Sequence, residues 1–397
     1  MSDLKIFTEN IEPEALNQVY TLIKQPAFED CKVRIMPDVH AGAGCVIGFT
    51  ADLGDKVIPN IVGVDIGCGM LCIQLSQKEI GLEKLDNVIR QYVPSGREVH
   101  DRRSIRFDKL QELCCFRELK DTKRMERSIG TLGGGNHFIE IDADEDGNMY
   151  LVIHSGSRNL GKQVADYYQN LAVEIMQGKD KLYEMQNKLI AEYKASGRKK
   201  EIEKAVKELH RKFNPNSLGI PKELCYLTGE YREKYLHDMK ICQEYAVLNR
   251  STMADIIMDK MGLSSEFAFE TIHNYIEHDT NMVRKGAVSA KKDQMLLIPI
   301  NMKDGCLVCR GKGNDDWNQS APHGAGRIMS RSKAKEIVDF EEYKESMEGI
   351  FTTSVKMATI DEAPMVYKPK QEIIDNIQDT VEVIKIIKPI YNFKACE

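Results

Sequence analysis

Apolar and polar positions divide the chain into three stretches of different pattern. Short apolar runs of β type, such as CVIGFTADL (45–53) and MLCIQLS (70–76), alternate with glycine-rich turns in residues 1–157. In residues 158–265 glycines are few and apolar residues recur every three or four positions, which is typical of helices. Residues 266–397 return to strand-like runs, and a helix is expected near 370–387. The pattern predicts an α+β fold with a mixed β-sheet core and a helical insertion at 158–265.

The chemically unusual residues lie in glycine-rich loops of the two outer stretches and not in the helical one. A single site built from both ends of the chain requires those ends to share one domain. Residues 1–397 are therefore expected to form a single catalytic domain, which the helices of 158–265 decorate. Part of this insertion is expected to be a charged helical hairpin, with the run at 189–213 forming a solvated helix face.

Composition narrows the class of protein. Of 397 residues 42% are apolar, which is enough for a sizeable core. The eleven cysteines lack the spacing of a secreted disulfide framework, and they indicate mostly free thiols in a reducing compartment. Neither a signal peptide nor a run of ~18 apolar residues is found, so a cytoplasmic location without membrane contact is expected. The net charge of −6 disfavours a protein that coats long RNA, but not an enzyme that holds RNA ends.

The run VGVDIGCGM (62–70) sets Asp65 and Cys68 three positions apart among glycines and apolar flanks. A buried carboxylate needs compensation of its charge, and a cation provides it; a thiolate beside it favours a transition metal. A glycine-rich turn with a capping aspartate and a packed cysteine explains the same residues without a metal.

Two further loops carry histidines beside strand-like runs. GGGNHF (133–138) sets Asn136 and His137 behind three glycines, whose backbone can approach a ligand closely. HSGSRNLG (154–161) sets His154 at the end of a strand and Arg158, a planar phosphate-binding group, before a helix. A tight turn around a hydrogen-bonded histidine also explains the first loop, and a serine helix cap also explains the second.

The last stretch offers two more loops. In TIHNYIEHD (271–279) either His273 or His278 is a candidate ligand, and His273 is favoured because His273-Asn274 repeats the pairing of the GGGNHF loop. In SAPHGAGR (320–327) small neighbours leave His323 accessible, which suits a covalent nucleophile for phosphoryl transfer. A further metal ligand or a histidine at a helix entry are the alternatives for His323. Together the loops indicate a metal site with a spare histidine.

Seven motifs, in order along nearly the whole chain, resemble those of the RtcB RNA-ligase family. They are MPDVHAGAGCVIG (36–48), VGVDIGCGM (62–70), GGGNHF (133–138), HSGSR (154–158), RKGA (284–287), HGAGR (323–327) and DEAPMVYK (361–368). The resemblance implies an RtcB-type fold and an enzyme that joins an RNA 3′-phosphate or 2′,3′-cyclic phosphate end to a 5′-hydroxyl end. It implies GTP and two Mn²⁺ as cofactors, and cleaved transfer RNA or ribosomal RNA as partners in RNA repair or tRNA splicing.

The resemblance also implies roles for single residues. Asp65, Cys68 and His137 would hold one Mn²⁺, and Cys68, His154 and His273 the second, with the thiolate bridging. His323 would be the guanylated nucleophile, and Arg158 and Arg327 would contact RNA phosphates. The guanylate contacts would be Asn136, Phe138, Glu140, Asn274, Pro299, Ile300, Asn301, Met302, Cys306, Gly324, Ala325, Gly326, Tyr367 and Lys394.

The chain departs from the family pattern beside the expected nucleotide. PINMKD (299–304) stands where most members read PGSMGT, Cys306 replaces a common serine, and Val283 replaces the usual histidine before RKGA. These departures indicate a divergent bacterial branch, with an RNA-repair or translation factor as a candidate partner. An alternative is a metal-dependent RNA-end phosphohydrolase or cyclic phosphodiesterase that does not ligate. A non-enzymatic factor that binds RNA ends or ribosomes has no need of His323 and the five ligands.

Overall fold

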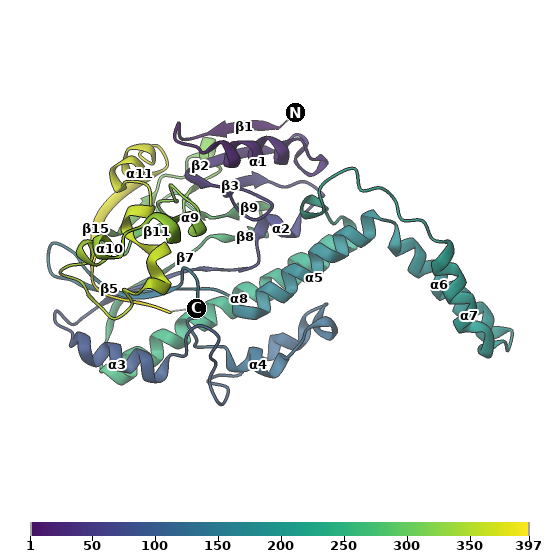
Figure 1. Ribbon diagram of the computed structural model, residues 1–397, viewed down its shortest axis with the longest axis horizontal. Coiled ribbons are helices and arrows are strands. Elements are labelled where there is room, and N and C mark those ends of the chain that lie inside the picture. The colour runs from purple at the N-terminus through teal and green to yellow at the C-terminus, as the bar shows by residue number, and fades with distance from the viewer. Residues whose placement is uncertain (1, 396–397) are drawn as a thin grey trace.

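The computed structural model describes residues 2–395, and its core is a large sheet with the strand order β11-β12-β15-β5-β6-β4-β7 and with β14 beside β15 (Figure 1). Its strands are β4 (Gly69–Leu75), β5 (Phe138–Ala143), β6 (Met149–Ser155), β7 (Ser265–Ile272), β11 (Met295–Asn301), β12 (Gly305–Gly311), β14 (Phe351–Thr352) and β15 (Val381–Lys394). The edge strands β11 and β7 approach each other, and Leu297 N–H donates to Thr271 Oγ1 at 3.0 Å. The sheet is therefore curled, and its inner face encloses part of the core.

A second sheet has the order β1-β2-β3-β9-β8, in which only β1 and β2 are parallel. Its strands are β1 (Asp3–Ile6), β2 (Lys32–His40), β3 (Ile47–Asp52), β8 (Asn274–Glu277) and β9 (Met282–Lys285). A short pair, β10 (Ala287–Ser289) and β13 (Ser320–Pro322), lies after it in the chain. The expected mixed α+β class is thereby confirmed.

Helices surround the sheets and differ widely in length. They are α1 (Pro13–Ile23), α2 (Pro59–Val62), α3 (Leu82–Tyr92), α4 (Thr122–Arg127), α5 (Arg158–Met176), α6 (Lys179–Ala195), α7 (Ile202–Lys212), α8 (Gly229–Met261), α9 (Arg331–Ile337), α10 (Phe340–Ser346) and α11 (Lys370–Asn376). Helices α3 and α8 pack their apolar residues on the outer face of the large sheet. Among residues 2–395 no helix is both long and apolar enough to cross a bilayer.

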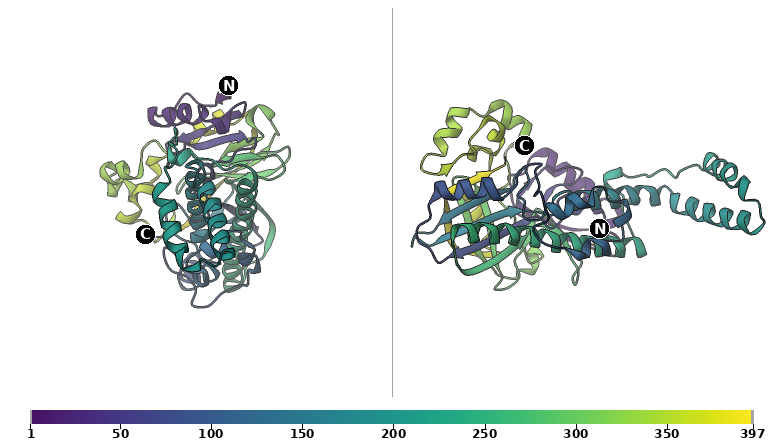
Figure 2. Two further views of the ribbon diagram at one scale, coloured as in Figure 1. Left: turned by 90° about the vertical axis from the view of Figure 1, so that its right-hand side faces the viewer. Right: turned by 90° about the horizontal axis from the view of Figure 1, so that it is seen from below.

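The helices of the middle stretch do two different things. Helix α8 contributes a row of buried residues, including Met253 and Ile257, to the core under the large sheet. Helices α6 and α7 form a hairpin that projects from the body (Figures 1 and 2). The hairpin therefore lies outside the core, whereas α8 is part of it, because a helix with one uniformly buried side packs into the core.

The helix expected over residues 370–387 ends early. Helix α11 stops at Asn376, and β15 begins at Val381. The run VEVIKIIKPIYNFK is rich in β-branched residues and pairs with both β12 and β5, so the ladder of a central strand overrides any helical period. Pro389, which cannot donate to a ladder, lies at an irregularity in the pairing with β5.

Candidate metal centre and nucleotide pocket

Strand register brings four loops to one end of the large sheet. Strand β4 pairs with β6 and β7 from Gly69 onward, and Phe138 at the start of β5 lies opposite His154. The residues that flank these pairs therefore converge on one point. Two overlapping clusters result, each with ligand atoms within 4.8 Å of one another: Asp65, Cys68 and His137, and Cys68, His154 and His273.

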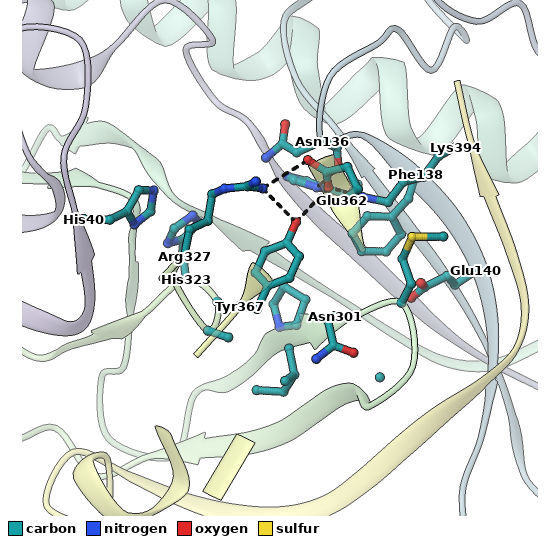
Figure 3. Close-up of a pocket in the computed structure, with 18 of the residues that line it drawn as sticks. His40, Asn136, Phe138, Glu140, Asn301, His323, Arg327, Glu362, Tyr367 and Lys394 are labelled. Carbon is teal, nitrogen blue, oxygen red and sulfur yellow. Dashed lines mark hydrogen bonds and ion pairs between the residues drawn. The ribbon is translucent and has the colours of Figure 1, made fainter. Parts of the chain in front are cut away.

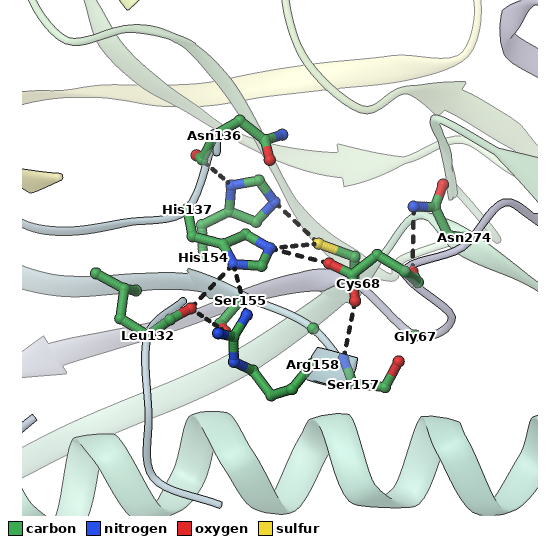
Figure 4. A network of polar contacts seen from close by, with 12 residues as sticks. Gly67, Cys68, Leu132, Asn136, His137, His154, Ser155, Ser157, Arg158 and Asn274 are labelled. Carbon is green, nitrogen blue, oxygen red and sulfur yellow. Dashed lines mark hydrogen bonds and ion pairs between the residues drawn. The ribbon is translucent and has the colours of Figure 1, made fainter. Parts of the chain in front are cut away.

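The first cluster is built around His137 (Figure 4). Its Nδ1 lies 2.9 Å from the Leu132 carbonyl oxygen, which can only accept, so Nδ1 carries the proton. The other nitrogen, Nε2, then directs a lone pair at Asp65 Oδ2, 3.0 Å away, and at Cys68 Sγ, 3.5 Å away. In the metal-free site a proton on one of these atoms separates the facing electron pairs, and a metal ion can take its place, so the donors fit a metal ion.

Asp65 is held ready as an anion. Burial would raise the pKa of this carboxyl, but its hydrogen bond with His137, when that ring carries both protons, and the charge of Arg158 lower the pKa to about 2. The Ser157 backbone N–H also donates to Asp65 Oδ1 at 3.0 Å. A carboxylate oxygen is thus available to a cation across the whole physiological pH range.

In the second cluster, too, a backbone carbonyl oxygen orients a histidine ring so that its other nitrogen faces Cys68. His154 Nδ1 lies 3.2 Å from the Asn136 carbonyl oxygen, which leaves Nε2 directed at Cys68 Sγ, 3.3 Å away. Burial, followed by the neighbouring imidazoles, lowers the pKa of His154 and His273 well below the ordinary value, so both rings are neutral. The buried Nδ1 of His273 has no hydrogen-bond partner among the described residues. Neutral imidazoles with unused nitrogens are the form that metal ions bind.

Cys68 belongs to both clusters. Burial, and then the charge of Asp65, raises the pKa of its thiol well above the ordinary value in the absence of a cation. A bound cation reverses this balance, because coordination deprotonates a thiol outright. A donor set of one thiolate, three imidazoles and one carboxylate suits Mn²⁺, Zn²⁺ or Co²⁺.

Two glycines of the quoted motifs are required by close approach. A Cβ on Gly133, whose φ is +86°, would lie 1.7 Å from Arg158 Nη1. A Cβ on Gly156 would lie 2.1 Å from Asp65 Oδ1. Any other residue at these positions would displace the guanidinium or the carboxylate, so the glycines shape the cluster from outside.

Helix α8 supports the loops of the cluster through two adjacent residues. Asn249 Oδ1 accepts the backbone N–H groups of Gly130 and Thr131 at 2.8 and 3.0 Å. Arg250 Nη1 donates to the carbonyl oxygens of Gly67 and Ser155 at 2.9 and 2.7 Å. Sequence reasoning missed both, because they lie in a regular helical run that carries no loop motif.

His323, which follows β13, is oriented by a buried aspartate. Asp38 Oδ2 in β2 accepts both the Nδ1–H and the backbone N–H of His323, at 2.6 and 3.1 Å. The described residues make no hydrogen bond to His323 Nε2, whose lone pair remains free for attack on an electrophile. The rings of His323 and His273 lie 4.9 Å apart, so the free histidine adjoins the metal cluster. Sequence reasoning quoted the motif that contains Asp38 but gave this residue no role.

A pocket opens beside His323 (Figure 3). It is lined by His40, Ile47, Asn136, Phe138, Glu140, His154, Pro299, Ile300, Asn301, Met302, Gly305, His323, Gly324, Ala325, Gly326, Arg327, Arg331, Glu362, Tyr367 and Lys394. All of the expected guanylate contacts are on this wall except Asn274 and Cys306. Asn274 instead donates to the Asp65 carbonyl oxygen at 3.3 Å, beside the metal cluster. Cys306 is buried behind the wall, next to Glu140.

Glu362, a second residue without an assigned role in the sequence motifs, balances the positive charge of this pocket. Its carboxylate pairs with Lys394 and with Arg331, and it accepts the Tyr367 hydroxyl at 2.8 Å. Burial would raise the pKa of Glu362, but the charges of Lys394 and Arg331 lower it to about 2. Lys394 is therefore held as a cation at a fixed position in the pocket wall.

The two arginines expected at RNA phosphates lie on different sides of the site. Arg158 lines a second cavity with Asp65, Arg97, Arg124 and Lys162. Arg327 lines the pocket of His323 and donates to the Asp361 carbonyl oxygen at 2.6 Å. His278, the alternative to His273 in the TIHNYIEHD loop, belongs to neither cluster, and its side chain is 72% exposed.

Two buried carboxyls lie close together on β5, with Glu140 at the pocket wall and Asp142 behind it. Glu140 and Asp142 project from the same face of β5 toward Cys306, and Asn392 donates to Glu140 at 2.5 Å. Burial raises the pKa of Glu140 to about 7, and burial together with the charge of Glu140 raises that of Asp142 well above its ordinary value. Both groups are consequently protonated in the folded protein at mildly acidic pH.

This pair predicts a pH-dependent stability. A carboxyl whose pKa is raised by folding stabilises the folded protein only while it is protonated. The contribution of Glu140 to the free energy of unfolding is therefore complete below its ordinary pKa near 4, and it is lost as the pH rises through about 7. Asp142→Asn removes one of the two charges, and we expect its effect on the free energy of unfolding to become more stabilising by about 1–3 kcal/mol between pH 5 and pH 8. Thermal unfolding across this range measures the difference. Asp146→Asn, at an exposed position of the next turn, is the control, and a gain independent of pH would contradict the prediction.

Comparison with known proteins agrees with this geometry. The sequence pattern of the family described as "tRNA-splicing ligase RtcB" matches residues 18–118 and 115–395. The chain belongs to the RtcB family. It is 29% identical to the "RNA-splicing ligase RtcB" of Escherichia coli strain K12, with 99% of this chain and 97% of that protein covered. The "tRNA-splicing ligase RtcB" of Archaeoglobus fulgidus is 24% identical, with 92% and 87% covered. The RtcB family assignment made from the seven motifs is confirmed.

Proposed function

We propose that this RtcB-family protein is a GTP- and Mn²⁺-dependent RNA ligase that joins 3′-phosphate or 2′,3′-cyclic phosphate ends to 5′-hydroxyl ends. One observation carries the proposal. His323, whose Nε2 is free, lines a pocket that also holds Arg327, Arg331 and Lys394, and its ring centroid lies 4.9 Å from that of His273 in the cluster suited to cations. A histidine that is oriented by an aspartate and lies beside both a cation site and a pocket is suited to covalent nucleotide transfer. A protein that only binds RNA would not require this arrangement.

Asp65, Cys68 and His137 would hold one Mn²⁺, and Cys68, His154 and His273 would hold the other. Two such ions supply charge neutralisation at the phosphates and a clamp for in-line displacement. Asn136 and Ser157 also serve the metal cluster through their backbone. Their backbone groups fix the orientation of His154 and Asp65, so that the ligands need not rearrange.

In the first step His323 Nε2 attacks the α-phosphorus of GTP. A nitrogen–phosphorus bond forms, the bond to the β-phosphate oxygen breaks, and pyrophosphate leaves with its electron pair. Asp38 accepts the Nδ1–H throughout and so stabilises the positive charge that develops on the ring. Lys394, in the pocket wall, is positioned to contact the nucleotide phosphate or ribose, and Arg327 in the same wall is a proposed contact for an RNA phosphate.

In the next steps the RNA 3′-phosphate takes the guanylate from His323, and the 5′-hydroxyl then attacks the 3′-phosphorus and displaces GMP. A 2′,3′-cyclic phosphate must first be opened by water to the 3′-phosphate. Arg158, next to Asp65 in the second cavity, is the proposed phosphate contact for an RNA end. Cleaved transfer RNA and cleaved ribosomal RNA are the proposed substrates, in bacterial RNA repair or tRNA splicing.

A ligation assay tests the function. Two RNA strands, one ending in a 2′,3′-cyclic phosphate and one beginning with a labelled 5′-hydroxyl, are incubated with Mn²⁺ and GTP. We expect a joined product that depends on both additions, and cleaved transfer RNA and ribosomal RNA compared in parallel will identify the preferred substrate. Ends that are opened or dephosphorylated but never joined would contradict ligation and would support the phosphohydrolase.

A further inference from the structure

The helical hairpin formed by α6, the distal turn and α7 (residues 179–212) extends away from the catalytic body (Figures 1 and 2). Its base is closed by a backbone hydrogen bond from Asn216 N–H to the Gln177 carbonyl oxygen at 3.0 Å. Leu182, near the base, is its one buried residue. The hairpin therefore adds almost nothing to the core, and its value to the protein must lie at its surface.

The charge of the hairpin is opposite to that of the rest of the chain. Residues 179–212 contain eleven Lys and Arg against six Asp and Glu, a net charge of +5. The whole chain carries −6, so everything outside the hairpin carries −11. A positive segment on a negative body is an electrostatic contrast that attracts a polyanion to one place.

The positive charges lie on the outer surface of the hairpin. Lys204, Lys207 and Arg211 are spaced three and four positions apart on the exposed face of α7. Lys199 and Lys200 occupy the distal turn and are exposed. Among the described residues, no acidic side chain forms an ion pair with Lys199, Lys200 or Lys204. These cations are available to a partner.

Most apolar residues of the hairpin lie between its two helices, α6 and α7. Leu189, Tyr193, Val206 and Leu209 are half-buried and recur at helical spacing, as expected for the seam between two helices. Tyr183 and Met185, 44% and 55% exposed, are the large apolar side chains open to solvent in this part of the described chain. Two isolated side chains do not form the continuous apolar face that a membrane surface or an apolar protein groove would need.

The position of the hairpin fixes where a polyanion would be bound. Arg158, beside Asp65, begins α5, and the hairpin follows the far end of that helix. Nineteen residues of α5 span about 28 Å, so the base of the hairpin is about that far from Arg158 and the distal turn is farther still. The hairpin cannot touch the reacting ends, and only a large folded nucleic acid reaches both places at once.

We propose that residues 179–212 form a basic arm that binds the phosphate backbone of a folded RNA at a distance from its broken ends. This inference rests on the proposed ligase function and adds a substrate class to it: large structured RNA rather than short strands. The arm supplies affinity without sequence specificity, because its contacts are lysine and arginine charges directed at phosphates.

The test compares two full-length variants that each lose three exposed lysines. The arm variant is Lys199→Gln, Lys200→Gln and Lys204→Gln; the matched control is Lys24→Gln, Lys84→Gln and Lys388→Gln on the body. Binding of a nicked folded RNA is measured as a function of salt. We expect the slope of log affinity against log salt to fall by about two to three in the arm variant, with affinity at least ~10-fold weaker at physiological ionic strength.

Ligation of the same RNA and of strands a few nucleotides long separates this proposal from the proposed function. We expect the arm variant to lose kcat/KM on the folded RNA while it joins the short strands and accepts GMP on His323 as the unchanged protein does. An unchanged salt slope, or an equal loss in the control variant, would overturn the arm, as would a preference for an acidic protein or a vesicle over RNA. Failure of the unchanged protein to join short strands would instead count against the ligase.

Discussion

Alanine in place of His323 is expected to abolish the transfer of label from α-labelled GTP to the protein. No described side chain other than His323 combines an unused ring nitrogen, a buried aspartate partner and a place in the pocket wall. Without it no nitrogen–phosphorus bond can form, and ligation should fall to the background of the assay. Gel analysis of the denatured protein after incubation with GTP and Mn²⁺ measures the adduct directly.

Two further variants define what the His323 result means. His278→Ala removes an exposed histidine from a nearby loop and should leave the adduct unchanged. Asp38→Asn keeps the size of the side chain but weakens its hold on Nδ1–H, and we expect slower labelling by about 10–100-fold with the adduct still forming. Labelling that persists in His323→Ala would remove the covalent mechanism.

Alanine in place of Cys68 is expected to impair both proposed cation sites at once. Its Sγ is within 3.5 Å of His137 Nε2 and His154 Nε2, and it is the one residue common to the two clusters. We expect the number of bound Mn²⁺ ions to fall from two per chain to one weakly held ion or none. Because metal ions supply several kcal/mol to phosphoryl transfer, ligation should drop by about 10³-fold or more. Titration calorimetry with Mn²⁺ gives the stoichiometry.

The matched control is Cys72→Ala, four residues farther along the chain in β4, the strand that begins directly after Cys68. Cys72 is equally buried but belongs to neither cluster, so Mn²⁺ stoichiometry and ligation should be preserved, with a stability cost of about 1 kcal/mol for the smaller side chain. If Cys68→Ala still bound two Mn²⁺ ions with unchanged affinity, the shared-thiolate arrangement would be wrong.

The metal cluster could be predicted from the sequence because its ligand residues lie in glycine-rich loops, where polar side chains of this kind are uncommon. A histidine or carboxylate beside several glycines, as at Asp65 and His137, is costly without a ligand and so stands out from core packing. Strand register then brings these loops together, and all five predicted ligands lie in two overlapping groups. Their roles as ligands, like the roles of the pocket residues, stay predictions until metal and nucleotide are measured.

Other features could not be predicted because their causes are tertiary. Asp38 acquires its role only when β2 lies beside the loop after β13, some 285 residues away in the chain. Asn249 and Arg250 read as ordinary helical positions until α8 packs against the sheet. The predicted helix covers part of β15, because the local sequence pattern does not show that β12 and β5 pair with this β-branched run. The boundary of the domain at 1–397 remains a prediction.

The spread of the cluster along the chain has a consequence for protein synthesis. Asp65 and Cys68 leave the ribosome early, but His273 and His323 follow only after the 33 residues of α8 and the strands behind it. A nascent chain that ends before His273 can complete only the Asp65 cluster, and one that ends before His323 has no nucleophile. Under the proposed mechanism, a chain that ends before His323 could not accept GMP and would consume no GTP.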